Sequence, residues 1–127
     1  MLTANLPQGR EHPTGVPCVG DVFWLDTSAC YGDDIKPTRP AVVLRPAIFG
    51  ILPEVLVLVR TSAEEFPSEY VKHDRDPTIG LDRDGIFPKN YQRRVDQRFF
   101  AMPMYASYQG TLGDPHLTQL LRMVGLL

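Results

Sequence analysis

The stretch from residue 20 to residue 62 decides the fold. It holds three segments of similar composition, namely GDVFWLD at 20–26, RPAVVL at 39–44 and VLVLVR at 55–60. Their β-branched and aromatic residues are typical of β-strands. Arg39 and Pro40 open the second segment, and Thr61 and Ser62 follow the third. A guanidinium and two hydroxyls at strand ends are groups that can bind the oxygens of a phosphodiester.

The composition indicates one globular domain. The chain has 127 residues, of which 43% are hydrophobic and 22% charged, as in an ordinary globular protein. No run approaches the ~18 consecutive apolar residues of a membrane span. The start shows no basic segment followed by an apolar one, so we expect no signal peptide and a cytoplasmic location. The formal net charge of −2 argues against a general duplex-DNA binder, so a nucleic-acid site would have to be local.

Cysteines and histidines do not form a metal-binding pattern. Cys18 and Cys30 lie far from any pair of histidines, because His12, His73 and His116 are scattered along the chain. In a reducing compartment the two cysteines are expected to be unpaired. We therefore expect neither a metal nor a cofactor.

Residues 1–19 are rich in proline and glycine and show no apolar periodicity, which predicts an N-terminal arm that is poorly ordered unless it docks. The domain proper is expected at residues 20–127. Loop residues dominate 27–38, and a long loop of this kind is often functional. Short strands are expected at 21–25, 40–45, 55–60, around 70–72, at 86–87 and at 92–96.

A single helix is predicted near the end of the chain. Asp114 is suited to its N-cap and Pro115 to its first position. The apolar residues that follow have helical spacing, at Leu117, Leu120, Leu121 and Val124. Many short strands with one terminal helix predict a mainly β fold, a small β-barrel capped by a C-terminal α-helix.

In order and spacing these motifs resemble the PemK/MazF-like toxins of type II toxin–antitoxin systems. The resemblance covers roughly residues 20–127 and rests on short motifs, namely GDVFW at 20–24, TRPAVVL at 38–44, LVRTS at 58–62, GIF at 85–87 with RRVD at 93–96, and GTL at 110–112 before the closing helix. It implies an SH3-like barrel, usually a homodimer. It also implies a metal-independent endoribonuclease that cleaves single-stranded RNA, arrests growth and is held inactive by a cognate antitoxin.

The resemblance assigns candidate roles to residues of this chain. Arg39 matches the Arg of the family's Arg-Pro motif and is the first catalytic candidate, because a guanidinium can stabilise the charge that develops on a phosphate. Thr61, at the end of the third segment, is the second. For both, a structural role is the alternative: an ion pair with the preceding acidic loop for Arg39, and a turn cap for Thr61.

Further residues are predicted to bind RNA. They are Asp33, Asp34 and Lys36 in the loop before Arg39, then Ser62, Lys89 and Arg93. Asp33 and Asp34 fall where some members of the family carry His-Glu or Ser-Glu ahead of the Arg-Pro motif. A carboxylate there could act as a base or position RNA; loop solvation is the alternative. His73 has a side chain suited to acid–base work, but nothing in its spacing ties it to Arg39.

One departure from the family pattern bears on activity. Some relatives carry an Arg-x-Asp pair after the 85–87 motif, and an ungapped match places Pro88 and Asn90 at those positions. Proline has no side-chain donor and a neutral amide is a poor base. The alternative to an endoribonuclease is therefore a catalytically weak or inactive binding module. The related gyrase-inhibiting branch is disfavoured, because its Trp-Gly tail is replaced here by Val124 and Gly125.

Overall fold

The computed structural model describes residues 6–26, 38–48, 51 and 53–127. Seven strands are described, namely β1 (Asp21–Leu25), β2 (Arg39–Arg45), β3 (Glu54–Val59), β4 (Tyr70–His73), β5 (Gly85–Pro88), β6 (Gln92–Asp96) and β7 (Ala106–Thr111). The helices are α2 (His116–Met123) and three short 3-10 helices, η1 (Pro77–Ile79), η2 (Lys89–Tyr91) and η3 (Gln97–Ala101).

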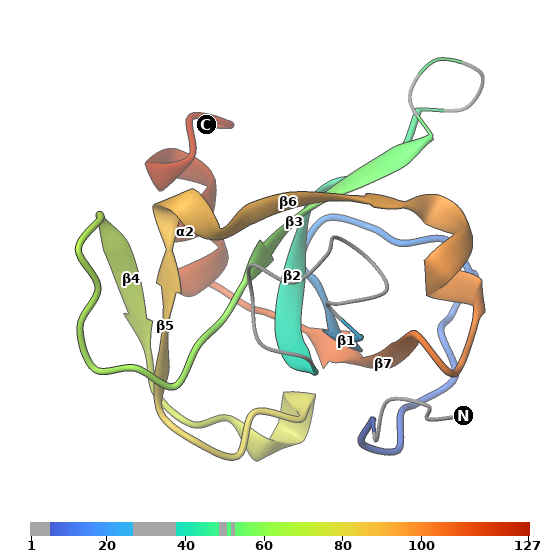
Figure 1. Cartoon of the computed structure of the whole chain (residues 1–127), viewed down its shortest axis with the longest axis horizontal. Coiled ribbons are helices and arrows are strands. Elements are labelled where there is room, and N and C mark those ends of the chain that lie inside the picture. Colours follow the sequence, from blue (N-terminus) through green and yellow to red (C-terminus); the bar gives the residue numbers. More distant parts are fainter. Residues whose placement is uncertain (1–5, 27–37, 49–50, 52) are drawn as a thin grey trace.

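The strands form two antiparallel sheets (Figure 1). The larger has five strands in the order β6-β3-β2-β1-β7, and the smaller pairs β4 with β5. In the larger sheet Val22 pairs with Val42, and Ala41 pairs with Val59. A single bridge between Thr61 and Ile86 joins the two sheets. This bridge places the chain that leaves β3 beside the β4–β5 pair.

The predicted mainly β fold with a C-terminal helix is confirmed, but the predicted closed barrel is not found in the described residues. Their strands leave β6 and β7 as the two edges of the larger sheet. No strand of the β4–β5 pair reaches the outer edge of β7. That edge receives the N-terminal arm instead, where the backbone N–H of Arg10 donates to the carbonyl of Tyr108 at 2.8 Å.

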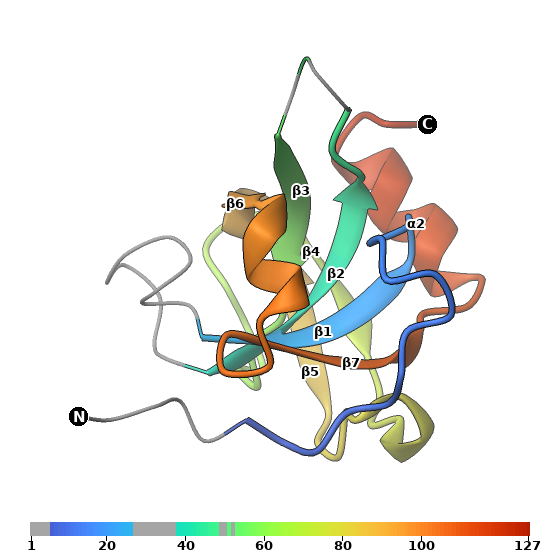
Figure 2. The same cartoon turned by 90° about the vertical axis from the view of Figure 1, so that its right-hand side faces the viewer.

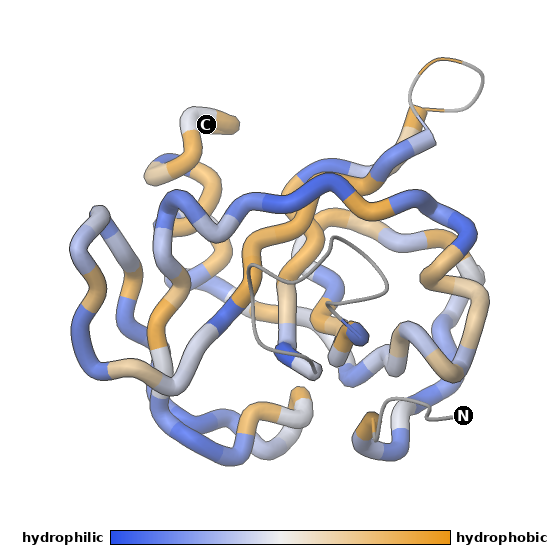
Figure 3. The backbone as a smooth tube through the Cα atoms, in the orientation of Figure 1, coloured by the Kyte–Doolittle hydropathy of each residue, from blue (hydrophilic) through white to orange (hydrophobic). Residues whose placement is uncertain are grey.

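Both faces of the five-stranded sheet are covered, which explains the continuous apolar runs in β2 and β3. On one face Val42 and Leu58 pack with Phe87 of β5 and Leu120 of α2. On the other face a second cluster packs around Phe23, Val43, Val57 and Val95, against the aromatic rings of Phe99, Phe100 and Tyr108. Figure 3 shows apolar residues along β2 and β3, while hydrophilic residues follow most of β6.

Helix α2 has the predicted apolar stripe but begins later than predicted. Its first residue is His116, and Pro115 takes the N-cap position. The Asp114 carboxylate still caps the helix, because it accepts hydrogen bonds from the Oγ1 and the N–H of Thr118 at 2.6 and 3.0 Å. These two bonds, the hydroxyl first, lower the pKa of Asp114. Leu120 is buried in the core, so the stripe packs on the sheet.

The described part of the N-terminal arm, from residue 6, lies along β7 (Figure 2). Ser107 Oγ donates to the carbonyl of Pro7 at 2.7 Å, and Asp21 Oδ2 lies 2.7 Å from Nε2 of His12. The sequence does not predict β7, whose residues Ala106–Thr111 are mostly small or polar. Pairing with β1 on one side and the arm on the other supplies the stabilisation that its own composition lacks.

Candidate functional site

A pocket of about 510 Å³ lies where the ends of β1, β2 and β3 meet the β4–β5 loop, residues 74–84. The sheet side of the pocket is formed by Trp24, Arg39, Pro40, Arg60, Thr61 and Ser62. The loop side is formed by Pro77, Gly80, Leu81, Asp82 and Arg83. The pocket therefore brings together residues from five separate parts of the chain, since Pro7 of the arm also lines it.

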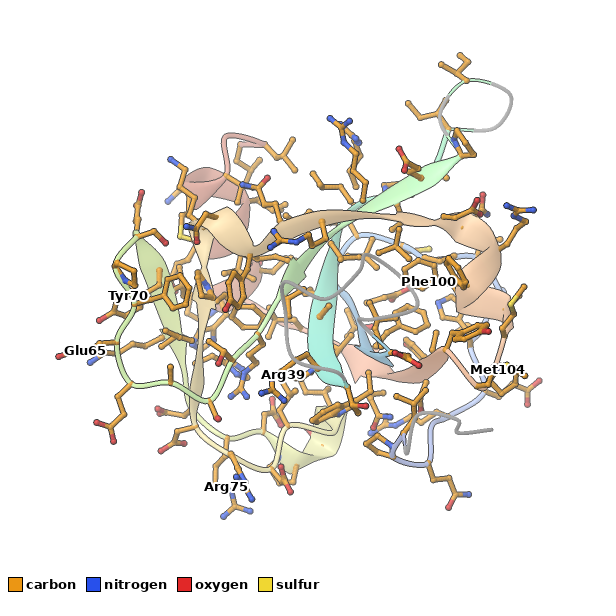
Figure 4. The ribbon with its side chains drawn as sticks, in the orientation of Figure 1. Arg39, Glu65, Tyr70, Arg75, Phe100 and Met104 are labelled. Carbon is orange, nitrogen blue, oxygen red and sulfur yellow. The ribbon has the colours of Figure 1, made fainter. Side chains whose placement is uncertain are left out.

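The pairing of β2 with β1 fixes the position of Arg39, the first residue of β2. It pairs with Leu25, is half-buried, and lies at the end of β2 in Figure 4. Among the described residues its guanidinium makes one hydrogen bond, from Nη1 to the carbonyl of Thr38 at 3.3 Å. Thr38 has a φ of 59°, a left-handed conformation that a β-branched residue rarely adopts. Strained residues of this kind concentrate at functional sites.

Thr61 and Ser62 follow β3 and face the same pocket as Arg39. The backbone of Thr61 is fixed by two hydrogen bonds to Ile86, at 3.0 and 2.9 Å. Its Oγ1 accepts a long 3.4 Å hydrogen bond from the N–H of Ala63, so the expected turn-capping role is present. That bond uses the oxygen only as an acceptor, and the hydroxyl hydrogen can still be donated to a ligand.

Arg60 lies beneath the pocket and is only 4% exposed. Its Nη2 donates to the carbonyls of Arg83 and His73, at 2.7 and 3.0 Å, and its guanidinium lies 5.9 Å from the ring centroid of Phe87. Burial lowers the pKa of Arg60 from its ordinary value, and the carboxylate of Asp84 opposes that effect. The bonds tie the two ends of the β4–β5 loop to the end of β3.

Trp24 provides a second tie between the two sides of the pocket. Its Nε1 donates to the carbonyl of Gly80 at 2.9 Å. Gly80 has a φ of 73°, and a Cβ at this position would overlap the side chain of Gln109, so only glycine fits the turn after η1. The sequence context of Trp24, within an apolar strand, favours a core position; in the structure it is half-buried and lines the pocket.

The pocket is positively charged, although the chain as a whole has a formal net charge of −2. Among the described residues that line it, three are arginines (Arg39, Arg60 and Arg83) and one, Asp82, is acidic. Proline, leucine and tryptophan side chains form the remaining apolar surface. Guanidinium groups beside aromatic and apolar surface are the chemistry by which proteins hold single-stranded nucleic acids.

Comparison with solved structures assigns the architecture. A crystal structure of MazF from Deinococcus radiodurans superposes with a TM-score of 0.62 at 23% identity, covering 87% of this chain and 94% of that one. The chain has the MazF fold. Two MazE–MazF crystal structures from the same organism give TM-scores of 0.58 and 0.57 at 22% identity, covering 87% of this chain and 92% and 93% of theirs. No family model and no curated protein sequence matches the chain.

Two of the residues predicted to bind RNA lie elsewhere on this MazF-like fold. Lys89 does not line the pocket, and its Nζ lies 3.8 Å from Oε1 of Glu69. Arg93 is on β6, where it donates to the carbonyls of Asn90 and Gln92 and lies over the ring of Tyr91. The other loop candidates, Asp33, Asp34 and Lys36, lie outside the described residues.

Pro88 and Asn90, the two departures from the family pattern, also lie away from the pocket. Pro88 ends β5, and Asn90 is in η2, where its Oδ1 accepts a hydrogen bond from Ser68 Oγ at 3.0 Å. Neither lines the pocket that contains Arg39. Among the described residues that line the pocket, Asp82 is the one carboxylate, and it is therefore the candidate there for a general base.

His73 does not share the pocket with Arg39. It is 4% exposed at the end of β4, with ring centroids 5.7 Å from Phe87 and 4.7 Å from His116. Burial, followed by the nearby charge of Arg60, lowers the pKa of His73 to about 4. The described residues contain no group of three or more side chains able to hold a metal ion, and no helix among them is long and apolar enough to span a membrane.

Sequence reasoning missed Trp24, Arg60, Asp82 and Arg83 as pocket residues. One signal was present for Arg60, since a charged residue ends an otherwise apolar strand directly before Thr61. Asp82 and Arg83 gave no such signal, because they belong to a run of charged loop residues that resembles any solvated surface. Only the fold of the β4–β5 loop places them opposite Arg39.

Proposed function

We propose that this protein is the toxin of a type II toxin–antitoxin system and acts as a metal-independent endoribonuclease on single-stranded RNA. The observation that carries the proposal is the shared pocket of Arg39 and Thr61, which contains an excess of guanidinium groups. The MazF fold agrees with it. Arg39 would contact the scissile phosphate, with Thr61 and Ser62 as hydroxyl donors beside it.

The reaction follows from these groups. The ribose 2′-oxygen attacks the neighbouring phosphorus and loses its proton to a base, while the bond to the 5′-oxygen breaks and that oxygen gains a proton. The products are a 2′,3′-cyclic phosphate and a 5′-hydroxyl. Arg39 stabilises the negative charge on the non-bridging oxygens, and Thr61 donates a hydrogen bond to one of them. Asp82 is a candidate for the base, as are Asp33 and Asp34 of the preceding loop.

The test uses long single-stranded RNA incubated with purified protein in EDTA. We expect fragments with 2′,3′-cyclic phosphate ends. Arg39→Ala should lower the rate about 10²-fold or more, because loss of a group that stabilises the transition state typically has an effect of that size. Arg75→Ala is the matched control: Arg75 is exposed, does not line the pocket, and points away from it in Figure 4.

Two results would contradict the proposal. RNA that stays intact through prolonged incubation would favour the alternative, a binding module without catalysis, which is motivated by Pro88 and Asn90 standing where some relatives carry an Arg-x-Asp pair. Cleavage that persists in Arg39→Ala at the wild-type rate would place the chemistry elsewhere. Lys89 and Arg93 remain proposed RNA contacts outside the pocket, and their alanine variants should weaken binding without lowering the cleavage rate at saturation.

The expected partners follow from the same pocket. An antitoxin would be an acidic, largely disordered segment that occupies the pocket and neutralises its arginines. The MazE–MazF structures among those similar to this chain agree with such a partner. We further propose a cytoplasmic homodimer, which a measurement of mass in solution would test directly.

A further inference from the structure

Arg83 is an exposed arginine on the loop side of the pocket. Among the described residues its guanidinium makes neither a hydrogen bond nor an ion pair. The carboxylates on either side of it do not neutralise it by contact: Asp84 Oδ1 accepts the backbone N–H of Arg75 at 2.7 Å, and Asp82 lines the pocket. Arg83 therefore presents a charge to the pocket that no described group holds in place.

The backbone of Arg83, in contrast, is held firmly. Its carbonyl accepts the 2.7 Å hydrogen bond from the buried Arg60, whose other bond fixes the carbonyl of His73 at the far end of the loop. Gly85 makes room for this arrangement, because a Cβ there would lie 2.8 Å from Cζ of Arg60. A short fixed segment thus carries the free guanidinium, and Arg60 determines where that segment lies.

We propose that Arg83 is a second phosphate-binding residue of this pocket and that Arg60 is the residue that positions it. This inference rests on the proposed function. Arg39 on the sheet side and Arg83 on the loop side then bind two phosphates of one RNA strand, which passes between them. Although Arg60 lines the pocket, it is buried and its Nη2 is committed to two carbonyls, so we assign it a positioning role and not a contact with the RNA.

Salt dependence measures phosphate binding separately from cleavage. For single strands the slope of log K against log salt concentration changes by roughly 0.7 for each phosphate that the protein ceases to neutralise. The ligand is a 2′-O-methyl oligonucleotide, which has no free 2′-hydroxyl and cannot be cleaved by the proposed route. Its affinity for the full chain is measured by fluorescence anisotropy at several salt concentrations.

Arg83→Ala should weaken binding about tenfold at low salt and reduce the magnitude of the slope by about 0.7. Arg75→Ala removes an exposed arginine from the same loop that does not line the pocket, and should leave the slope unchanged. An unchanged slope in Arg83→Ala, or equal reductions in the two variants, would overturn the assignment of Arg83.

The role of Arg60 needs a double variant. If Arg60 acts only through Arg83, then Arg60→Met should reduce the slope by about 0.7, and the double variant Arg60→Met/Arg83→Ala by no more than that. A reduction of about 1.4 in the double variant would mean that Arg60 itself binds phosphate, and would overturn its positioning role. Arg60→Lys, which can still donate to a carbonyl, should recover part of the affinity that Arg60→Met loses.

Failure of this inference and failure of the proposed function are distinguishable. If RNA is never cleaved but the slope falls in Arg83→Ala, the phosphate-binding role stands without the nuclease. If RNA is cleaved and Arg83→Ala binds with the wild-type slope, the nuclease stands and Arg83 is excluded.

Discussion

The two sides of the pocket are held by different kinds of interaction. On the sheet side, Arg39 and Trp24 lie within the antiparallel β1–β2 ladder, and the β2–β3 ladder ends close to Thr61. On the loop side, residues 74–84 are attached through single side chains, above all by the bonds from Arg60 and Trp24. Many backbone hydrogen bonds hold the sheet side, whereas a single side-chain substitution can detach the loop side.

The two sides of the pocket therefore differ in how they respond to substitution. A ladder tolerates most side-chain changes, because its bonds belong to the backbone, so the sheet side can keep Arg39 and Thr61 in fixed relation. The loop side depends on a few side-chain bonds, so a change at Arg60 or Trp24 would disturb it more than a change on the sheet side.

The largest effect is expected at His73, the last residue of β4, which directly precedes the loop side and responds to acid. Burial and the charge of Arg60 hold the pKa of His73 at about 4, below the value near 6.5 of an unfolded chain, and the carboxylates of Asp76 and Asp74 only partly oppose them. Between these two pH values the unfolded state binds more protons. The contribution of neutral His73 to the free energy of unfolding is therefore fully present above about pH 6.5. It is lost as the pH is lowered towards 4, by about 3 kcal/mol in all.

Urea unfolding at a series of pH values measures this decrease. His73→Gln has no titrating ring, so its free energy of unfolding should change by clearly less between pH 6.5 and pH 4 than that of the wild type. The comparison uses the change in the free energy of unfolding with pH, so a destabilisation by the substitution that does not depend on pH has no influence on it. Parallel slopes in the two proteins would show that His73 does not titrate as its burial requires.

The second effect concerns the junction where the two sides touch, at Gly85. A Cβ there would meet the carbonyl oxygen of Thr61 at 2.6 Å and Cζ of Arg60 at 2.8 Å, and the first of these is backbone in the sheet-side segment. We expect Gly85→Ala to destabilise the protein by about 2 kcal/mol, as overpacking in a tight site does.

Gly113→Ala is the matched control for Gly85→Ala. No atom lies within 4 Å of its added Cβ, and its φ is not in the left-handed region. This variant should be unchanged or slightly more stable, because alanine reduces the freedom of the unfolded chain. Urea unfolding of both variants gives the comparison, and equal stability of the two would mean that the loop side can shift freely against β3.

The same contrast explains what the sequence could predict. The strand β1 was predicted at its observed bounds because a β-branched and aromatic run bounded by loop residues is a direct signal of a strand. The bounds of β6 were also predicted, although its sequence QRRVD has Val95 as its one β-branched residue. The predicted barrel is not confirmed for the described strands, since no sequence pattern reveals which edges of a sheet pair. β7 was missed because its small and polar residues become a strand only through pairing with β1.

The candidate site divides in the same way. Arg39, Thr61 and Ser62, which line the pocket, could be singled out from sequence because each stands at the end of a recognisable strand. Their proposed roles remain predictions. Trp24, Arg60 and Arg83 were not, since their contacts join residues far apart in the chain: Trp24 reaches Gly80 across 56 positions, and Arg60 reaches Arg83 across 23. Such pairs depend on the whole fold, and a local pattern does not contain them.

The smallest expected effect is on the N-terminal arm, which is attached to β1 by a side chain and to β7 by a backbone hydrogen bond. Asp21 Oδ2 accepts from Nε2 of His12 and from the N–H of Cys18, both at 2.7 Å, and Asp21 is 5% exposed. Asp21→Asn keeps the shape but removes the charge that strengthens both bonds, so we expect stability to fall by about 1 kcal/mol. Glu11→Gln makes the same charge change at an exposed arm residue and should have no effect.

Amide hydrogen exchange locates this destabilisation. The N–H of Arg10 donates to the carbonyl of Tyr108, so its protection reports on docking of the arm to β7, whereas the N–H of Val57 reports on the central sheet. Asp21→Asn should lower protection at Arg10 by more than at Val57. An equal decrease at both amides would mean that the arm and the sheet open as one unit. The arm would then belong to the ladder-held part of the molecule, although it is attached to β1 by a side chain.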